Sequence, residues 1–271
     1  EQLEDFFFFF KRPDGNPYLL ILNYPGNPDG ITYGAESVKQ LAETCRKNNI
    51  YILSDEIYGQ LHHEGKHVSI AKYYPEGTII SSGLSKWCGA GGWRLGTFSF
   101  PAKLHWLMDA MAAVASETYT SVSAPIQYAA IQAFLCGSEI ENYLSHVRKI
   151  LALLGKETAA ILKNGNISVN DPTGGFYLFL DFTPLSEKLV KRGIADGSIL
   201  CDRLLDECGV AILPGVDFNR PAEELSARLS YVDFDGAKAL SASYSIPLHE
   251  KFPADFLFQY CGNVIEAAEK I

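Results

Sequence analysis

The sequence has 271 residues, 47% hydrophobic and 20% charged, which is the composition of an ordinary globular protein and not of a disordered chain. Asp and Glu number 32 against 23 Lys and Arg, so the formal net charge is −9. This acidic balance disfavours nucleic acids and anionic membranes as partners, because both need basic patches. No apolar run is long enough to cross a bilayer. Six scattered cysteines without a CxxC pair predict reduced thiols in a cytoplasmic protein.

The first predicted elements alternate between strand and helix. Residues 1–11 are expected to end a helix, and the apolar run at residues 18–23 is typical of a strand buried on both faces. Residues 35–48 have helical spacing, and residues 50–53 form the next predicted strand, with Asp55 at its end. This order of strand, helix and strand predicts a parallel sheet.

Three histidines, His62, His63 and His67, could indicate a metal site. Gly65 lies among them and favours a turn instead. We therefore predict no metal.

The chain is organised around residues 78–100, TIISSGLSKWCGAGGWRLGTFSF. A β-rich start is expected to break at residues 81–83, and Lys86 follows in a turn with glycines and Arg94 behind it. A lysine after a strand of an α/β sheet lies where such sheets bind ligands. Glycines let a ligand approach the backbone, and the planar guanidinium of arginine suits a phosphate.

After this stretch the pattern changes from long helices to short strands, which predicts a second, α+β portion. We expect the boundary near residue 145, inside a long helix, which gives domains at residues 1–145 and 146–271. The predicted helices cover residues 102–115, 124–134, 139–164, 197–208 and 254–271, and the predicted strands cover residues 175–182, 210–213 and 228–232.

Two further motifs accompany the lysine stretch: NYPGNPDG at residues 23–30 and SDEIY at residues 54–58. With these three elements in this order, the sequence resembles the class I/II aminotransferases, fold-type I enzymes that use pyridoxal 5′-phosphate (PLP). The resemblance implies a mainly parallel α/β large domain that binds PLP and a C-terminal α+β small domain. Family members carry a long segment before the PGNPxG element, so the chain is similar to a family member that lacks its N-terminal portion.

The resemblance also implies a role for each matching residue. Lys86 would form a Schiff base with PLP and then move the substrate proton, and the Asp55 carboxylate would hold the proton of the ring nitrogen. Asn27 and Tyr58 match the residues that hydrogen-bond the ring hydroxyl oxygen. Arg228 matches the arginine that grips the substrate α-carboxylate, and Asn27 is also expected to contact the substrate. A structural ion pair is the alternative for Arg228, because an arginine in an apolar run needs a partner. The implied cofactor-binding residues are Asn27, Asp55, Tyr58, Ser85, Lys86 and Arg94.

One position departs from the family pattern. Where the family has a serine three residues before the lysine, this chain has Gly83, so Ser81, Ser82 or Ser85 would supply the hydroxyl for the phosphate.

The activity that the resemblance implies is transfer of an amino group between an amino acid and a 2-oxo acid, by a homodimer whose residues 117–125 approach the other subunit's cofactor. A C–S lyase or an aminocyclopropane-carboxylate synthase would keep the same cofactor residues. The effector domain of a transcription regulator is a third alternative, which would need a basic DNA-binding module upstream.

Overall fold

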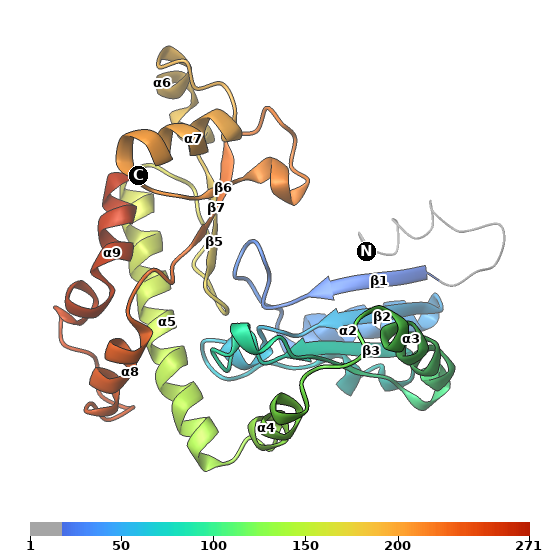
Figure 1. The fold of residues 1–271 in the computed structure, drawn as a ribbon. Helices are drawn as coiled ribbons and strands as arrows, with labels where there is room; N and C mark the ends of the chain where they lie inside the picture. The colour runs from blue at the N-terminus through green and yellow to red at the C-terminus, as the bar shows by residue number, and fades with distance from the viewer. Residues whose placement is uncertain (1–17) are drawn as a thin grey trace. The chain divides into compact units, whose positions relative to one another are not determined.

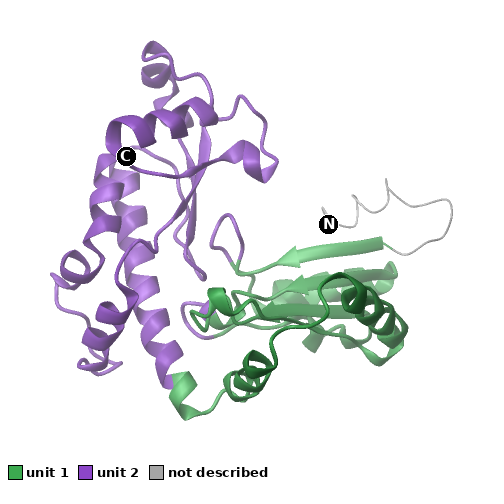
Figure 2. Ribbon diagram, viewed as in Figure 1, with its two compact units in different colours: residues 1–25, 32–60, 66–141 green, residues 26–31, 61–65, 142–271 purple. Residues whose placement is uncertain are grey.

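The computed structural model describes residues 18–271, so the helix predicted at residues 1–11 lies outside the described part (Figure 1). The chain forms two compact units (Figure 2). Of the described residues, unit 1 holds 18–25, 32–60 and 66–141, and unit 2 holds 26–31, 61–65 and 142–271. The domains at residues 1–145 and 146–271 stay a proposal beside this division.

Unit 1 contains a four-stranded sheet in the order β1-β2-β3-β4. Strands β1 (Tyr18–Asn23), β2 (Ile50–Asp55) and β3 (Thr78–Gly83) are parallel, and β4 (Gly96–Ser99) is antiparallel to β3. The prediction of a mainly parallel sheet is therefore confirmed. The predicted break at residues 81–83 is wrong, because these residues pair with β4 and extend the strand.

Helix α2 (Ala35–Lys47) buries one side chain per turn, at Val38, Ala42 and Cys45. This spacing of three and four residues gives an apolar stripe. The stripe packs on the side chains of β1 and β2 that point to the same face of the sheet, so the core of unit 1 lies between the helix and that face. The buried strand residues in this cluster are Leu22, Ile50 and Ile52.

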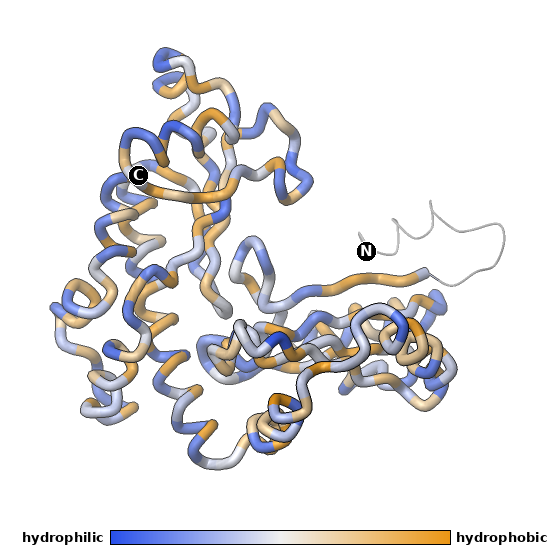
Figure 3. The backbone as a smooth tube through the Cα atoms, in the orientation of Figure 1, coloured by the Kyte–Doolittle hydropathy of each residue, from blue (hydrophilic) through white to orange (hydrophobic). Residues whose placement is uncertain are grey.

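The other face of β1 is open, although the strand is hydrophobic along its length (Figure 3). The side chains of Leu19 and Ile21 are 57% and 67% exposed. The prediction of a strand buried on both faces is wrong for β1, because alternate side chains point away from α2 and no described residue covers them fully. A hollow of about 460 Å³ lies on this part of unit 1, lined by apolar residues that include Leu19, Leu53, Phe98 and Trp106.

Two helices follow the sheet in unit 1. The predicted helix at residues 102–115 starts as a 3₁₀ turn, and α3 itself is His105–Thr118. Helix α4 (Ala124–Phe134) has the predicted bounds, and Pro125 in its first turn explains the sharp start, since proline fits there without losing a helix hydrogen bond.

Unit 2 contains a three-stranded antiparallel sheet in the order β5-β7-β6. Its strands are β5 (Tyr177–Asp181), β6 (Leu213–Pro214) and β7 (Ser226–Ser230). The strand predicted at residues 210–213 is wrong except for Leu213, because helix α7 (Gly197–Cys208) ends just before it. Gly209 is left-handed, with φ +69°, and the Val210 N–H donates to Leu204 O at 3.1 Å.

The long helix α5 (Ser138–Asn164) leads into unit 2, as predicted, although its first residues belong to unit 1. Among residues 18–271, no helix combines the length and the apolar character that a membrane crossing needs. The other helices of unit 2 are α6 (Ser186–Lys191), α7 (Gly197–Cys208), α8 (Gly236–Tyr244) and α9 (Phe256–Lys270), of which α6 and α8 were not predicted.

Candidate functional site

The polar residues of unit 1 gather where its parallel strands end. The strand register places Asn23 opposite Asp55, and Asp55 opposite Ser81. Since parallel strands end at one edge of a sheet, the ends of β1, β2 and β3 form a common rim. Asp55 is the last residue of β2, at the position predicted for it.

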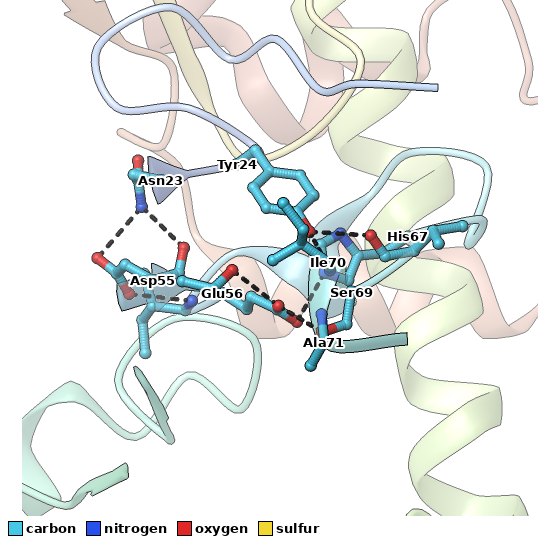
Figure 4. A network of polar contacts seen from close by, with 11 residues as sticks. Asn23, Tyr24, Asp55, Glu56, His67, Ser69, Ile70 and Ala71 are labelled. Atoms are coloured by element: carbon cyan, nitrogen blue, oxygen red, sulfur yellow. Dashed lines mark hydrogen bonds and ion pairs between the residues drawn. The ribbon is translucent and has the colours of Figure 1, made fainter. Parts of the chain in front are cut away.

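The Asp55 carboxylate is held by two donors. The Asn23 side-chain amide donates to Oδ2 at 3.2 Å, and the Ile57 backbone N–H donates to Oδ1 at 3.3 Å (Figure 4). Burial raises the pKa of Asp55, and the hydrogen bonds from Ile57 and Asn23 act in the opposite direction. A half-buried carboxylate at a strand end can accept a hydrogen bond from a cationic N–H group.

Next to Asp55, Glu56 is the centre of a polar network that the sequence analysis missed. Its carboxylate accepts hydrogen bonds from the hydroxyls of Ser54 and Ser69, at 2.9 and 2.6 Å, and contacts Nε2 of His67 at 2.9 Å (Figure 4). Burial alone would raise the pKa of Glu56, but the contacts with His67 and Ser69 outweigh it, so the pKa is lowered. The network fixes the chain directly after Asp55.

The residues on either side of Asp55 could have indicated this network from the sequence. Ser54 and Glu56 flank Asp55, and alternate residues of a strand point to opposite faces, so both should point away from Asp55. A glutamate pointing into a core needs partners. The identity of the partner His67 could not be read from the sequence, because it depends on the loop that follows.

Lys86 lies in the turn after β3, as predicted. The N–H of Leu84 donates to Leu95 O at 3.2 Å, and the N–H of Gly89 donates to Lys86 O at 3.1 Å, so the turn is tied at both ends. Nζ of Lys86 lies 5.9 Å from the centre of the Tyr58 ring, which is buried. Unit 1 thus brings the predicted lysine and tyrosine together.

Gly83 at the end of β3 pairs with Gly96 at the start of β4, so the two strands lie close together on both sides of the turn. A Cβ on Gly83 would lie 2.6 Å from Leu95 O, so the close approach of the two strands leaves no room for a side chain. A serine at position 83 would therefore be crowded in this chain. Ser85 is half-buried in the turn beside the lysine, and Arg94 is exposed, with a left-handed backbone (φ +53°) and a bond from Nη1 to Gly91 O at 2.7 Å.

Unit 2 holds the other two predicted residues, Asn27 and Arg228. Nη1 of Arg228 donates to Oδ1 of Asn27 at 2.9 Å. The guanidinium lies over the rings of Tyr177 and Phe218, 4.6 and 4.8 Å from their centres. The aromatic walls were not predicted, because Tyr177 and Phe218 come from β5 and from the 3₁₀ turn Gly215–Phe218.

The charge of Arg228 is not neutralised by a carboxylate within residues 18–271, so the structural ion pair considered from the sequence is not found there. Its Nε is buried and has no hydrogen-bond partner among the described residues. An arginine between two rings, with donors left over, can bind a carboxylate.

The described residues contain no group of three or more His, Cys, Asp or Glu side chains that could hold a metal ion. The chemistry of unit 1 is instead that of an amine, a carboxylate, a phenol and a guanidinium.

Comparison with known proteins extends these observations. The profile of the family "Aminotransferase class I and II" matches residues 11–237. An aspartate aminotransferase of Bacillus sp. strain YM-2 is 34% identical over 217 residues, which are 78% of this chain and 52% of that protein. The aspartate/prephenate aminotransferase of Thermus thermophilus is 33% identical, over 78% of this chain and 51% of that protein.

Solved structures agree with these matches. An aspartate aminotransferase from Thermus thermophilus, solved with maleate, superposes with a TM-score of 0.70 at 29% identity, over 84% of this chain and 55% of that one. The aromatic aminotransferase of Pyrococcus horikoshii superposes with a TM-score of 0.73 at 24% identity, which shows a shared fold. The chain spans about half the length of the relatives it matches.

Proposed function

Because the chain belongs to the class I and II aminotransferases, we propose that it moves an amino group between an amino acid and a 2-oxo acid with the aid of PLP. The relatives named above are all aminotransferases, which favours transamination over the elimination and ring-closing alternatives. The acidic balance of the chain gives no support to the regulator alternative.

The donor set of unit 1 fits PLP. The Asp55 carboxylate suits a protonated ring nitrogen, the Lys86 amine suits an aldehyde, and the Tyr58 hydroxyl suits the ring oxygen. When bound, PLP supplies an electron-accepting ring that makes the α-proton of an amino acid removable. Arg94, with Ser85, suits the phosphate, because a guanidinium binds its oxygens with paired donors.

In this proposal Lys86 holds the cofactor aldehyde and later, as a neutral amine, takes the proton from Cα of the substrate. The tied turn supports this role, since a proton acceptor must be held in place. The orientation of the carboxylate of Asp55, set by Asn23 and Ile57, supports its role as the partner of the ring nitrogen.

Arg228 and Asn27 are proposed to bind the substrate α-carboxylate. The support is the hydrogen bond between them, the two aromatic walls and the absence of a carboxylate partner for the guanidinium within residues 18–271. A carboxylate held by a two-pronged contact has a fixed orientation, and this is what removal of one particular proton requires.

The observation that carries the proposal is that one unit contains both a lysine in a tied turn after one strand and a held carboxylate at the end of the neighbouring strand. The test is to mix the 271-residue protein with PLP, reduce with borohydride, digest, and locate the pyridoxyl group by mass spectrometry. We expect it on Lys86. A label on Lys72 or Lys103, with Lys86 unmodified, would refute the assignment.

We further propose that the protein acts as a homodimer in the cytoplasm. Family resemblance at residues 117–125 supports the dimer, and the scattered cysteines support a reducing compartment. A monomer by light scattering that still bound PLP tightly would contradict the dimer.

A further inference from the structure

Asn23 ends β1 and stands opposite Asp55 in the parallel register. Asn23 is the first residue of the NYPGNPDG motif, and the resemblance gave it no role of its own. Its side chain nevertheless points at the functional carboxylate (Figure 4).

The contact with the backbone settles which way the Asn23 amide faces. Nδ2 lies 3.2 Å from the backbone O of Asp55 and 3.2 Å from Oδ2 of the same residue. A backbone carbonyl can only accept a hydrogen bond, so the group that faces it must be the NH₂ group. Both of these acceptors belong to Asp55.

The two contacts have different consequences. The bond to the backbone O ties the end of β2 to the end of β1, and the bond to Oδ2 fixes rotation of the carboxylate. With Ile57 on Oδ1, each oxygen has a donor from a different side. Carboxylate oxygens have more than one lone pair, so Asp55 can still accept a hydrogen bond from a ligand.

The Asn23 amide also favours the charged form of Asp55. Burial acts to raise the pKa of this carboxyl group, and the donated hydrogen bond acts to lower it. Removing the amide would therefore release the carboxylate from its orientation and favour its neutral form, which holds a cationic N–H less well.

We propose that Asn23 is a positioning residue that orients the Asp55 carboxylate for the ring nitrogen of PLP. The inference rests on the proposed function and deepens it, since it assigns a second residue to the recognition of one cofactor atom.

The test compares two probes: PLP, and its carbocyclic analogue in which C–H replaces the ring nitrogen. Binding of each to the 271-residue protein is measured by absorbance or fluorescence titration. We expect Asn23→Leu to weaken PLP binding about 5- to 100-fold, within the range of coupling between residues of one hydrogen-bond network. Binding of the analogue should change by less than about threefold, because it lacks the atom that Asp55 contacts.

Two further variants secure the interpretation. Asn23→Asp keeps the shape of the side chain but places a second carboxylate beside Asp55, and it should also weaken PLP selectively. In an Asp55→Ala background, Asn23→Leu should cause no additional loss, because residues that act through one another are not additive.

The matched control is Asn48→Leu. The Asn48 amide donates to the backbone O of Thr44 at 2.8 Å, so the same substitution removes a backbone contact at the end of α2, before the start of the strand that Asp55 ends. PLP binding should remain at the level of the unsubstituted protein.

Three results would overturn the inference. Equal losses for PLP and the analogue would make Asn23 a structural residue, and unchanged PLP binding in both Asn23 variants would remove any role. If the unsubstituted protein bound no PLP, the proposed function itself would fail, and this inference with it.

Discussion

Arg228→Lys is the substitution that tests the substrate end of the proposal most directly. It keeps the positive charge between Tyr177 and Phe218, where a lysine ammonium can also lie over an aromatic ring. What it removes is the planar fork that contacts Asn27 and can bind a carboxylate with two parallel donors.

The magnitude follows from the number of contacts. A guanidinium can give a carboxylate two charge-assisted hydrogen bonds, and an ammonium in the same place retains one of them. The lost contact costs about 1.5–3 kcal/mol. At about 1.4 kcal/mol for each factor of ten, kcat/KM should fall about 10- to 150-fold.

The assay measures kcat/KM for several amino acids and 2-oxo acids, together with PLP affinity. All substrates should lose about the same factor, because they share the α-carboxylate, and PLP affinity should be unchanged. The matched control is Arg220→Lys, an exposed arginine of the same unit that pairs with Glu224, and it should leave all constants unaltered.

A loss confined to one substrate, or none, would refute the reasoning. Arg228 would then be a structural residue that serves Asn27 and the two rings, and the carboxylate site would lie elsewhere.

Two further predictions concern the neighbourhood of Asp55. Glu56→Gln should lower the free energy of unfolding at neutral pH by about 1.5–3 kcal/mol, the value of one hydrogen bond to a charged group. Because the folded pKa of Glu56 lies below the unfolded value of about 4.3, its contribution is complete above that pH and is lost as pH falls through the folded pKa. Urea unfolding at neutral and acid pH should therefore show a smaller pH dependence in Glu56→Gln but not in the exposed Glu223→Gln, and equal slopes would contradict this. Gly83→Ser should destabilise by about 1–3 kcal/mol, since its Cβ would crowd Leu95 O, and a thermal scan that shows no loss would mean that the strands separate easily.

The sequence predicted the bounds of the helices whose first or last residues are typical of a helix end. Helix α4 has proline in its first turn, and α7 ends at a glycine with φ +69°, so both had the predicted bounds. Helix α8 was missed because its sequence, GAKALSASY, is short and rich in small residues. Its start is set by Asp235, which accepts a hydrogen bond from the Lys238 N–H at 3.1 Å.

The residues of the candidate site also fall into those whose position a local motif predicts and those whose position it does not. The positions of Lys86 and Asp55 at or after a strand end could be predicted, because each belongs to a short motif next to a strand. Asn23 and His67 were missed, since their partners are set by strand register and by a loop, and neither is visible in local spacing. The burial of β1 was also predicted wrongly. An apolar run shows that a strand can be buried, but it does not show which other elements pack on its two faces.

The division of the chain into units has a consequence for any attempt to work with its parts. The backbone passes between the units at 25/26, 31/32, 60/61, 65/66 and 141/142, so no single cut separates them. A C-terminal fragment starting at residue 142 would lack Gly30 O and Leu61 O, which accept the N–H groups of Gly174 and Gly175 at 3.0 Å each. It would also carry Arg228 without Asn27. The unit that holds the proposed carboxylate site is therefore not a transferable module, and gene fusions or expression trials should keep residues 26–271 in one polypeptide.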